Sequence, residues 1–134
     1  MPARLRIEIF PSDLDRMIRF YSDVLGFHLV KHQGNYAYLN RDDIFIGAIE
    51  VASAQSVEQK AQYRQPTQGI EIVIEVDDLE RERDHIVGNG WKLEADIQSQ
   101  AWGLRDFRIL DPDGYYLRIT THSPNRDGKG FGTG

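Results

Sequence analysis

The sequence contains no cysteine and no long apolar run, and both absences limit what the chain can be. Without cysteine it can form no disulfide, no thiolate nucleophile and no zinc or iron–sulfur site built on sulfur. No segment approaches the roughly 18 apolar residues of a membrane helix, and the N-terminus lacks the apolar core of a signal peptide. We therefore expect a soluble, cytoplasmic protein with no membrane partner.

Positive charge is also scarce. The chain has 16 Lys and Arg against 21 Asp and Glu, a formal net charge of -5, and its arginines are scattered among acidic residues. Nucleic-acid binding needs a concentrated basic surface, so we expect no nucleic-acid partner. An acidic surface instead attracts cationic ligands at long range, although acidity is also common among soluble proteins in general.

What is present fits one folded domain. The chain has 134 residues, of which 40% are hydrophobic, and a chain of this length can bury a core of its own. We place a single domain at residues 1–124. Four glycines in the last seven residues predict a flexible tail at 125–134.

Two kinds of hydrophobic period run along the chain. Residues 4–10 alternate between apolar and polar side chains, which predicts a strand with one face in the core. A helical period follows, with Ser12 or Asp13 as its cap and Gly26 at its end. The apolar strand positions expected in the core are Leu5, Ile7 and Ile9, and in a later strand Ile70, Ile72 and Ile74.

The same order of elements occurs twice. Asp13-Leu14 recurs 65 residues later as Asp78-Leu79, and each half reads strand, helix, then three strands. This predicts an α+β fold of two βαβββ modules, at about 4–52 and 69–122, with a helix covering one face of each sheet. Residues 53–68, rich in Gln, Ser and Ala, predict a connecting loop with one helical turn. The remaining strands are expected at 27–32, 36–39, 44–51, 70–76, 92–97, 104–110 and 115–121, and the second helix at 78–87.

Two segments of the sequence, residues 20–27 and 102–114, resemble the signatures of the vicinal oxygen chelate superfamily, which contains glyoxalase I, extradiol dioxygenases and bleomycin-resistance proteins. The resemblance covers about residues 4–121. It implies paired βαβββ modules whose cupped mixed sheets are commonly completed across a homodimer. The first strand, residues 5–10, is the arm that we expect to be exchanged between the two copies.

The resemblance also implies where a metal would be held. Members that use a metal place ligands at the positions of Arg6, Glu71 and Arg118, and a fourth near residues 48–50. Because a guanidinium cannot deprotonate to bind a cation, we expect no metal and no cofactor. A weak site on Glu71 or Glu50 stays open. The four histidines, His28, His32, His85 and His122, are expected at the surface or partly buried.

The remaining features resemble the bleomycin-resistance branch, which binds its ligand without chemistry. Its tryptophan position matches Trp102 and its aromatic position matches Tyr36, with Tyr38 nearby; both kinds of residue could instead be structural. Offset stacking on such rings contributes about 0.5–1.5 kcal/mol beyond burial. The resemblance thus implies a protein that sequesters a flat, partly cationic small molecule. A metal-dependent lyase, isomerase or dioxygenase is the alternative, and a metal-free enzyme with a glutamate base is a third.

Strand parity places a set of charged and aromatic residues on the cup face. They can form a neutralising network between strands, or they can grip a ligand, with arginine on an anionic group and glutamate on a cationic one. We favour the network. Trp91, next to the second helix, is expected in the core. The cup-face residues are Arg6, Glu8, Glu71, Glu75, Tyr116 and Arg118.

Overall fold

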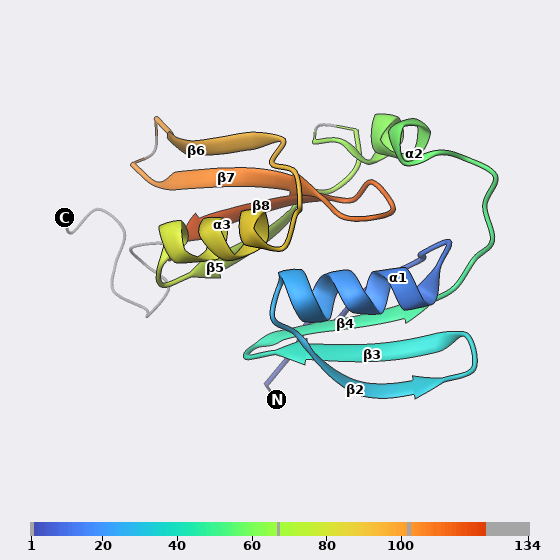
Figure 1. The fold of residues 1–134 in the computed structure, drawn as a ribbon. Coiled ribbons are helices and arrows are strands. Elements are labelled where there is room, and N and C mark those ends of the chain that lie inside the picture. Colours follow the sequence, from blue (N-terminus) through green and yellow to red (C-terminus); the bar gives the residue numbers. More distant parts are fainter. Residues whose placement is uncertain (1, 67, 102, 123–134) are drawn as a thin grey trace.

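Two four-stranded sheets form the framework of the protein, in a computed structural model that describes residues 2–66, 68–101 and 103–122 (Figure 1). In each sheet the first and last strands of a module run parallel and the other neighbours are antiparallel. The first sheet, in the order β1-β4-β3-β2, contains β1 (Ile7–Ile9), β2 (His28–Gln33), β3 (Tyr36–Arg41) and β4 (Ile44–Ile49). The second, in the order β5-β8-β7-β6, contains β5 (Ile72–Val76), β6 (Ala95–Ser99), β7 (Arg105–Leu110) and β8 (Tyr116–Thr121).

A helix follows the first strand of each module. In module one, α1 (Leu14–Arg19) continues as a π-helical segment, η1 (Phe20–Val24), and in module two the helix is α3 (Leu79–Gly88). Aspartate caps both, because Asp13 Oδ1 accepts from the backbone N–H of Arg16 at 3.0 Å and Asp78 Oδ1 from that of Arg81 at 3.1 Å. The prediction of a duplicated βαβββ unit is confirmed.

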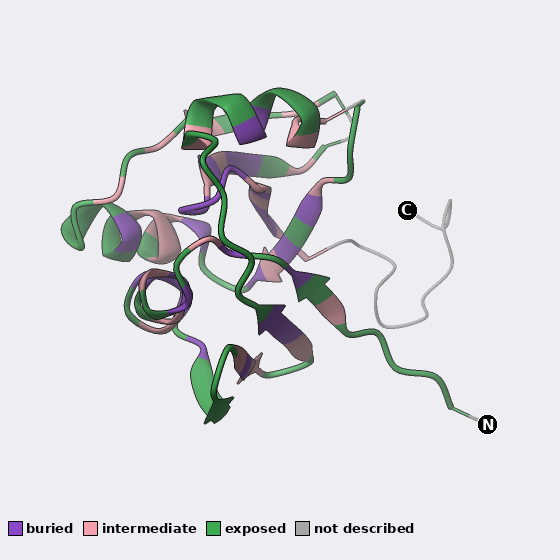
Figure 2. Cartoon of the chain, turned by 90° about the vertical axis from the view of Figure 1, so that its right-hand side faces the viewer, coloured by how far each residue is buried: buried purple, intermediate pink, exposed green. Residues whose placement is uncertain are grey.

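The helices pack in the angle between the two sheets, so the core is continuous across both modules (Figures 1 and 2). In β3, β5, β7 and β8 alternate residues point into this layer and are buried, whereas β2 is exposed along its whole length. The largest fully buried side chains are Tyr21, Phe107, Ile9, Met17, Leu25, Leu39, Ile46, Leu79, Ile86, Ile109, Leu117 and Ile119. None of the helices in the described part of the chain has the length and apolar composition of a membrane span.

Two residues predicted in the core are at the surface. Leu5 is 78% exposed and Ile70 is 69% exposed, whereas Ile9, Ile72 and Ile74 are buried as expected. Strands β1 and β5 begin at their first cross-strand partners, two residues after Leu5 and Ile70. The alternating pattern therefore extends beyond the length over which a neighbouring strand pairs with it.

The segment between the modules contains a helix rather than one turn in a loop. Helix α2 (Val57–Arg64) begins with a capping box, in which Ser56 Oγ accepts from the Gln59 N–H and Gln59 Oε1 accepts from the Ser56 N–H. It packs on the β7–β8 turn, where Gly114 lies so close that a Cβ there would be 2.9 Å from the backbone of α2. Packing on this turn stabilises a helix longer than the predicted single turn, although the sequence of the helix has almost no apolar period.

A buried ion pair fixes α2 to that turn. Lys60 is 4% exposed and its Nζ donates to Asp113 Oδ1 at 2.7 Å. Arg64 also donates to the Asp113 carbonyl at 2.7 Å, and Ser12 donates to Asp113 Oδ1 through both its N–H and its hydroxyl. Module one, α2 and module two therefore meet at one buried carboxylate.

A second buried carboxylate, Asp111, lies in the same turn and predicts a pH dependence of stability. Burial raises its pKa to about 6, against hydrogen bonds from Tyr115 N–H, Tyr21 hydroxyl and Asp113 N–H that favour the ionised form. An unfolded Asp ionises near 3.8, so between these values the folded state binds more protons and stability falls as the pH rises.

We expect this residue to lower the free energy of unfolding by about 2–3 kcal/mol as the pH rises from 4 to 7. The measurement is urea unfolding of the wild type and of Asp111→Asn across this range, since the amide does not titrate and can still accept on Oδ1. As the pH rises, the unfolding free energy of the wild type should fall relative to that of Asp111→Asn. A difference that does not change with pH contradicts the prediction.

Candidate functional site

The face of the second sheet that points away from the helices carries a network of charges, which we term the second open face (Glu71, Asp106, Arg108, Tyr116 and Arg118). Glu71 lies at its centre, with its Oε1 3.2 Å from Arg118 Nε and its Oε2 3.7 Å from Arg108 Nη1. Arg118 and Arg108 are register partners on β8 and β7, and Tyr116 lies two residues before Arg118 on the same face. One carboxylate thus separates two guanidinium groups that would otherwise repel each other.

Asp106 extends this network toward the end of the sheet. It is 2% exposed, accepts from Gln100 Nε2 at 3.0 Å and lies 3.8 Å from Arg118 Nη1. A buried carboxylate needs such partners to stay charged, and Arg118 is held between two of them. The second open face is therefore polar but close to neutral.

The corresponding face of the first sheet is more aromatic, and we term it the first open face (Arg6, Glu8, Tyr36, Tyr38 and Phe45). Arg6 Nη2 lies 3.7 Å from Glu8 Oε1, and its guanidinium carbon lies 5.9 Å from the centre of the Tyr38 ring. Tyr38 and Phe45 are tilted at 40° with their ring centres 6.4 Å apart. Tyr36 lies two residues before Tyr38 on β3.

The structure thus brings the predicted site residues into two groups, one on each sheet. Arg6, Glu8, Tyr36 and Tyr38 lie together on the first. The other predicted residues that the structure describes, Glu71, Glu75, Tyr116 and Arg118, lie on the second. Trp102 lies outside the described residues. Sequence reasoning did not select Asp106, Arg108 or Phe45, although the two-residue period of β7 puts Asp106 and Arg108 on the same face as each other.

The strand register also gives a counterpart in module one for Arg118, the last of the metal positions that the resemblance implies. Glu8 pairs with Gly47 on β4, just as Val73 pairs with Arg118 on β8, so Gly47 is the counterpart of Arg118. The register thus favours a fourth position one residue before the range 48–50 that the resemblance implies. Glu8 lies over this glycine, because a Cβ at Gly47 would be 1.7 Å from Glu8 Oε2.

The residues at these four positions do not fit a metal. They are Arg6, Gly47, Glu71 and Arg118, and the one carboxylate among them already faces two arginines. Glu50 is not available either, because its Oε2 accepts from the Leu14 N–H at the start of α1 at 2.8 Å. Over the described ranges no group of three or more His, Asp or Glu could hold a metal ion.

The histidines lie where they were expected. His28, His32 and His85 are exposed, and His122 is partly buried. On α3, His85 contacts the Asp23 carbonyl across the module interface through Nε2 at 2.8 Å.

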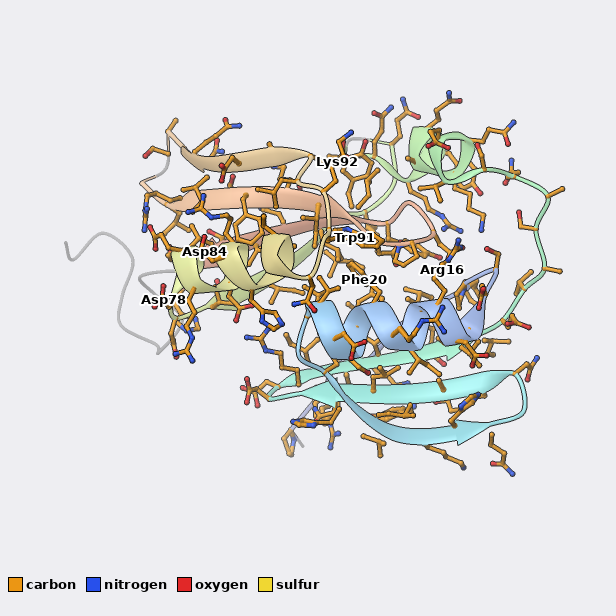
Figure 3. The ribbon with its side chains drawn as sticks, in the orientation of Figure 1. Arg16, Phe20, Asp78, Asp84, Trp91 and Lys92 are labelled. Atoms are coloured by element: carbon orange, nitrogen blue, oxygen red, sulfur yellow. The ribbon has the colours of Figure 1, made fainter. Side chains whose placement is uncertain are left out.

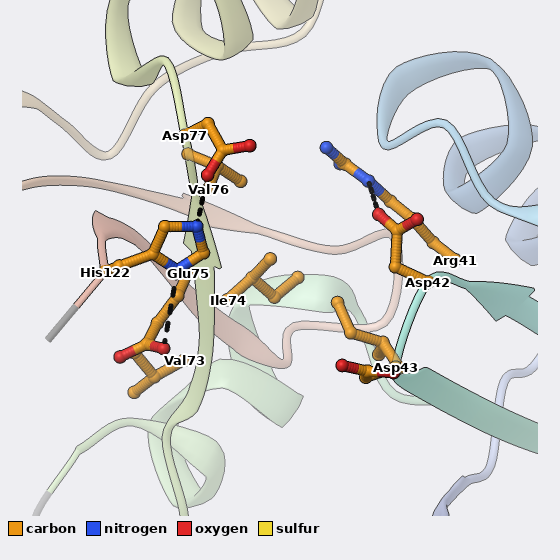
Figure 4. Close-up of a pocket in the computed structure, with 10 residues that line it drawn as sticks. Arg41, Asp42, Asp43, Val73, Ile74, Glu75, Val76, Asp77 and His122 are labelled. Atoms are coloured by element: carbon orange, nitrogen blue, oxygen red, sulfur yellow. Dashed lines mark hydrogen bonds and ion pairs between the residues drawn. The ribbon is translucent and has the colours of Figure 1, made fainter. Parts of the chain in front are cut away.

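An acidic crevice of ≈ 590 Å³ lies between the β3–β4 turn and the ends of β5 and β8 (Figure 4). His122 lies between two carboxylates there, with its Nε2 bonded to Asp77 Oδ1 and its Nδ1 3.8 Å from Glu75 Oε1. Asp42 and Asp43 face it from the other module, beside Arg41, which is paired with Glu82 on α3. The other lining residues are Ile44, Val73, Ile74 and Val76.

Paired βαβββ modules, with helices on one face of each sheet and polar and aromatic residues on the other, define a duplicated α+β fold. A profile of the Glyoxalase/Bleomycin resistance protein/Dioxygenase superfamily matches residues 4–119, and the chain belongs to that family.

The relatives of this chain include both a resistance protein and a lyase. A bleomycin resistance protein of Geobacillus stearothermophilus is 30% identical over 111 residues, 76% of this chain and 83% of the relative. A lactoylglutathione lyase of Haemophilus influenzae is 28% identical over 125 residues, 89% of this chain and 92% of that protein. The crystal structure of the bleomycin resistance determinant encoded on the transposon Tn5 has the same fold, with a TM-score of 0.72 at 18% identity over 91% of this chain and 99% of that one.

Proposed function

We propose that this protein is a small-molecule binding protein of the bleomycin-resistance type, which sequesters a flat, partly cationic ligand without chemistry. The observation that carries the proposal is which residues occupy the four metal positions that the resemblance implies. Three of them are Arg6, Gly47 and Arg118. The fourth, Glu71, is the one carboxylate, and two arginines neutralise it. A lyase of this family that depends on a metal would need more ligands than these positions offer.

The two open faces supply the contacts that such a ligand needs. Tyr36 and Tyr38 offer rings for a planar group, and the sequence adds Trp102 as a stacking partner. The acidic crevice suits the cationic part of the ligand, with Asp43 and Glu75 on opposite walls. Affinity then comes from stacking and charge.

We further propose that the binding cup is completed in a homodimer. Each open face is one wall of a cup, and β1 and β5 are both edge strands of their sheets. Apolar side chains beside them are exposed, including Leu5 at 78% and Phe10 at 45%. Exchange of the N-terminal arm, residues 5–10, would cover such side chains and pair these edges.

Native mass spectrometry of the freshly purified protein, with and without metal-free bleomycin, tests the proposal. We expect a dimer without stoichiometric metal that takes up the drug. In solution the drug should quench tryptophan fluorescence, and added salt should weaken its binding. Trp102→Ala should cost roughly 1–3 kcal/mol of affinity, by analogy with aromatic stacking on bases, and leave the fold intact.

The matched control is Tyr63→Ala, which removes a half-exposed ring of α2 that donates to Gln55 and belongs to neither open face. Its affinity for the drug should equal that of the wild type. Retention of one divalent metal with turnover of a glutathione hemithioacetal would establish the lyase alternative instead. Unchanged drug binding in Trp102→Ala, or no binding by the wild type, would overturn the proposed ligand class.

A further inference from the structure

Two cations lie beside the first open face in addition to its own arginine. Lys31 on β2 is the register partner of Tyr38 on β3, so the two side chains share a face. Toward β1, the guanidinium carbon of Arg4 lies 3.9 Å from the centre of the Phe45 ring. Both cations are exposed to solvent. Positive charge therefore borders this face near β1 and along β2.

The charge of this surface is positive, although the chain as a whole has a formal net charge of -5. Arg4, Arg6 and Lys31 are three cations, and Glu8 is the one carboxylate, which leaves a formal charge of +2. Arg6 Nη2 lies 3.7 Å from Glu8 Oε1, and the two side chains are 54% and 37% exposed. Neither Arg4 nor Lys31 has an acidic side chain within ion-pair distance among the described residues. An anionic group of a ligand can therefore reach these cations without breaking a buried ion pair.

The arginines of the second open face are held differently. Arg118 lies between two carboxylates, those of Glu71 at 3.2 Å and Asp106 at 3.8 Å. Arg108 lies 3.7 Å from the same glutamate. An anion brought to these arginines would have to compete with carboxylates that are already in place. Of the arginines expected to grip an anionic group, Arg6 is therefore better placed than Arg118.

An aromatic ring lies between the cations of the first open face. The guanidinium carbon of Arg6 is 5.9 Å from the centre of the Tyr38 ring, and Lys31 lies beside the same tyrosine on the next strand. On β4 the register partner of Tyr38 is Gly47, which has no side chain to cover the ring. Helix α1, which carries Arg16, covers the opposite side of the sheet (Figure 3). A planar group stacked on Tyr38 would thus have a cation on either side of it.

We propose that the first open face binds the flat part of the ligand as an aromatic carboxylate. The ring stacks on Tyr38, and the carboxylate accepts hydrogen bonds from Arg6 and Lys31. The acidic crevice begins at the β3–β4 turn of the same sheet, so the ligand carries an anionic flat group at one end and a cationic group at the other. This inference rests on the proposed function, because it names the charge of the flat group that the binding cup receives.

Titration of the purified protein with naphthoate, followed by ¹H–¹⁵N NMR, tests this assignment. We expect the backbone amide signals of Tyr38, Gly47 and Lys31 to shift most. Added salt should reduce the affinity, because the cations are exposed. Naphthylmethylamine has the same rings with the opposite charge, and it should bind to this face at least roughly threefold more weakly.

Four variants, each changing one exposed side chain, separate the charges. Arg6→Gln and Lys31→Gln should each weaken naphthoate binding roughly threefold to tenfold. Glu8→Gln removes the one carboxylate of the face and should tighten binding by a similar factor, a gain that misfolding cannot produce. Arg19→Gln changes the net charge as the first two variants do, but it lies on α1 at the other side of the sheet and should leave the affinity unchanged.

No binding of naphthoate, equal or tighter binding of the amine at Tyr38, or unchanged affinity in both Arg6→Gln and Lys31→Gln would overturn this inference. Metal-free bleomycin distinguishes its failure from that of the proposed function. Uptake of the drug without a preference for naphthoate would leave the proposed function standing. Naphthoate binding without uptake of the drug would instead remove the proposed drug ligand and keep the carboxylate site.

Discussion

Replacing Asp113 with alanine should lower the free energy of unfolding by about 3–5 kcal/mol, because it leaves the buried Lys60 ammonium without its partner. Asp113 is 1% exposed, and Lys60 Nζ lies 2.7 Å from its Oδ1. Burial alone would raise the pKa of Asp113, but the hydrogen bonds from Lys60 and Ser12 outweigh it and hold the pKa below its ordinary value. Urea unfolding at pH 7, followed by circular dichroism, gives the measurement.

The matched control is a double-mutant cycle. Lys60→Met should also be destabilising, because it leaves the buried Asp113 carboxylate without its cationic partner. The Lys60→Met/Asp113→Ala protein should lose clearly less unfolding free energy than the sum of the two single losses. The shortfall measures the coupling between the two charges. A loss of less than about 1 kcal/mol in Asp113→Ala, or strict additivity, would mean that the pair does not hold α2 on the turn.

Trp91→Ala should cost about 3 kcal/mol of stability, close to the lower end of the range for removing a packed tryptophan, because the ring is only partly buried. The indole packs on Phe20 from the other module and hydrogen-bonds to the Leu110 carbonyl, so its loss opens the contact between modules. Thermal unfolding followed by circular dichroism detects the change without relying on tryptophan emission.

Two further variants separate the causes. Trp91→Phe keeps an aromatic ring against Phe20 and loses the indole hydrogen bond, so it should cost about 1 kcal/mol. Trp102→Ala, at the position proposed for ligand stacking, should leave the unfolding temperature near that of the wild type. A Trp91→Ala protein as stable as the wild type would contradict the packing role that we assign to this residue.

The Lys60–Asp113 ion pair and the packing of Trp91 on Phe20 also support the proposed binding cup. Tyr116 and Arg118 begin β8 directly after the turn that carries Asp113 and Gly114. Their strand is thus fixed at one end by α2 and over its length by the helix layer. A second open face anchored in this way needs little rearrangement to form its wall of the proposed cup.

The sequence by itself determined the helix and strands of each βαβββ module and their duplication, but not helix α2 between the modules. Helix caps such as Asp13 and Asp78 and the alternation of β3 and β5 act within a few residues, so they can be read directly from the chain. The same parity placed Arg118 and Glu71 on one face, where the structure pairs them at 3.2 Å.

Only the tertiary structure decided which of these patterns are used, and where charge is buried. Lys60 looks like a surface lysine in a polar segment, yet its partner lies 53 residues away in the β7–β8 turn. Leu5 continues an apolar alternation but lies before the first residue of β1 that pairs with β4. The counterpart of Arg118 is Gly47, which the pairing of β1 with β4 reveals and residue counting missed. In each case the outcome depends on which distant segments pair or pack together, and local sequence carries no signal of such pairing.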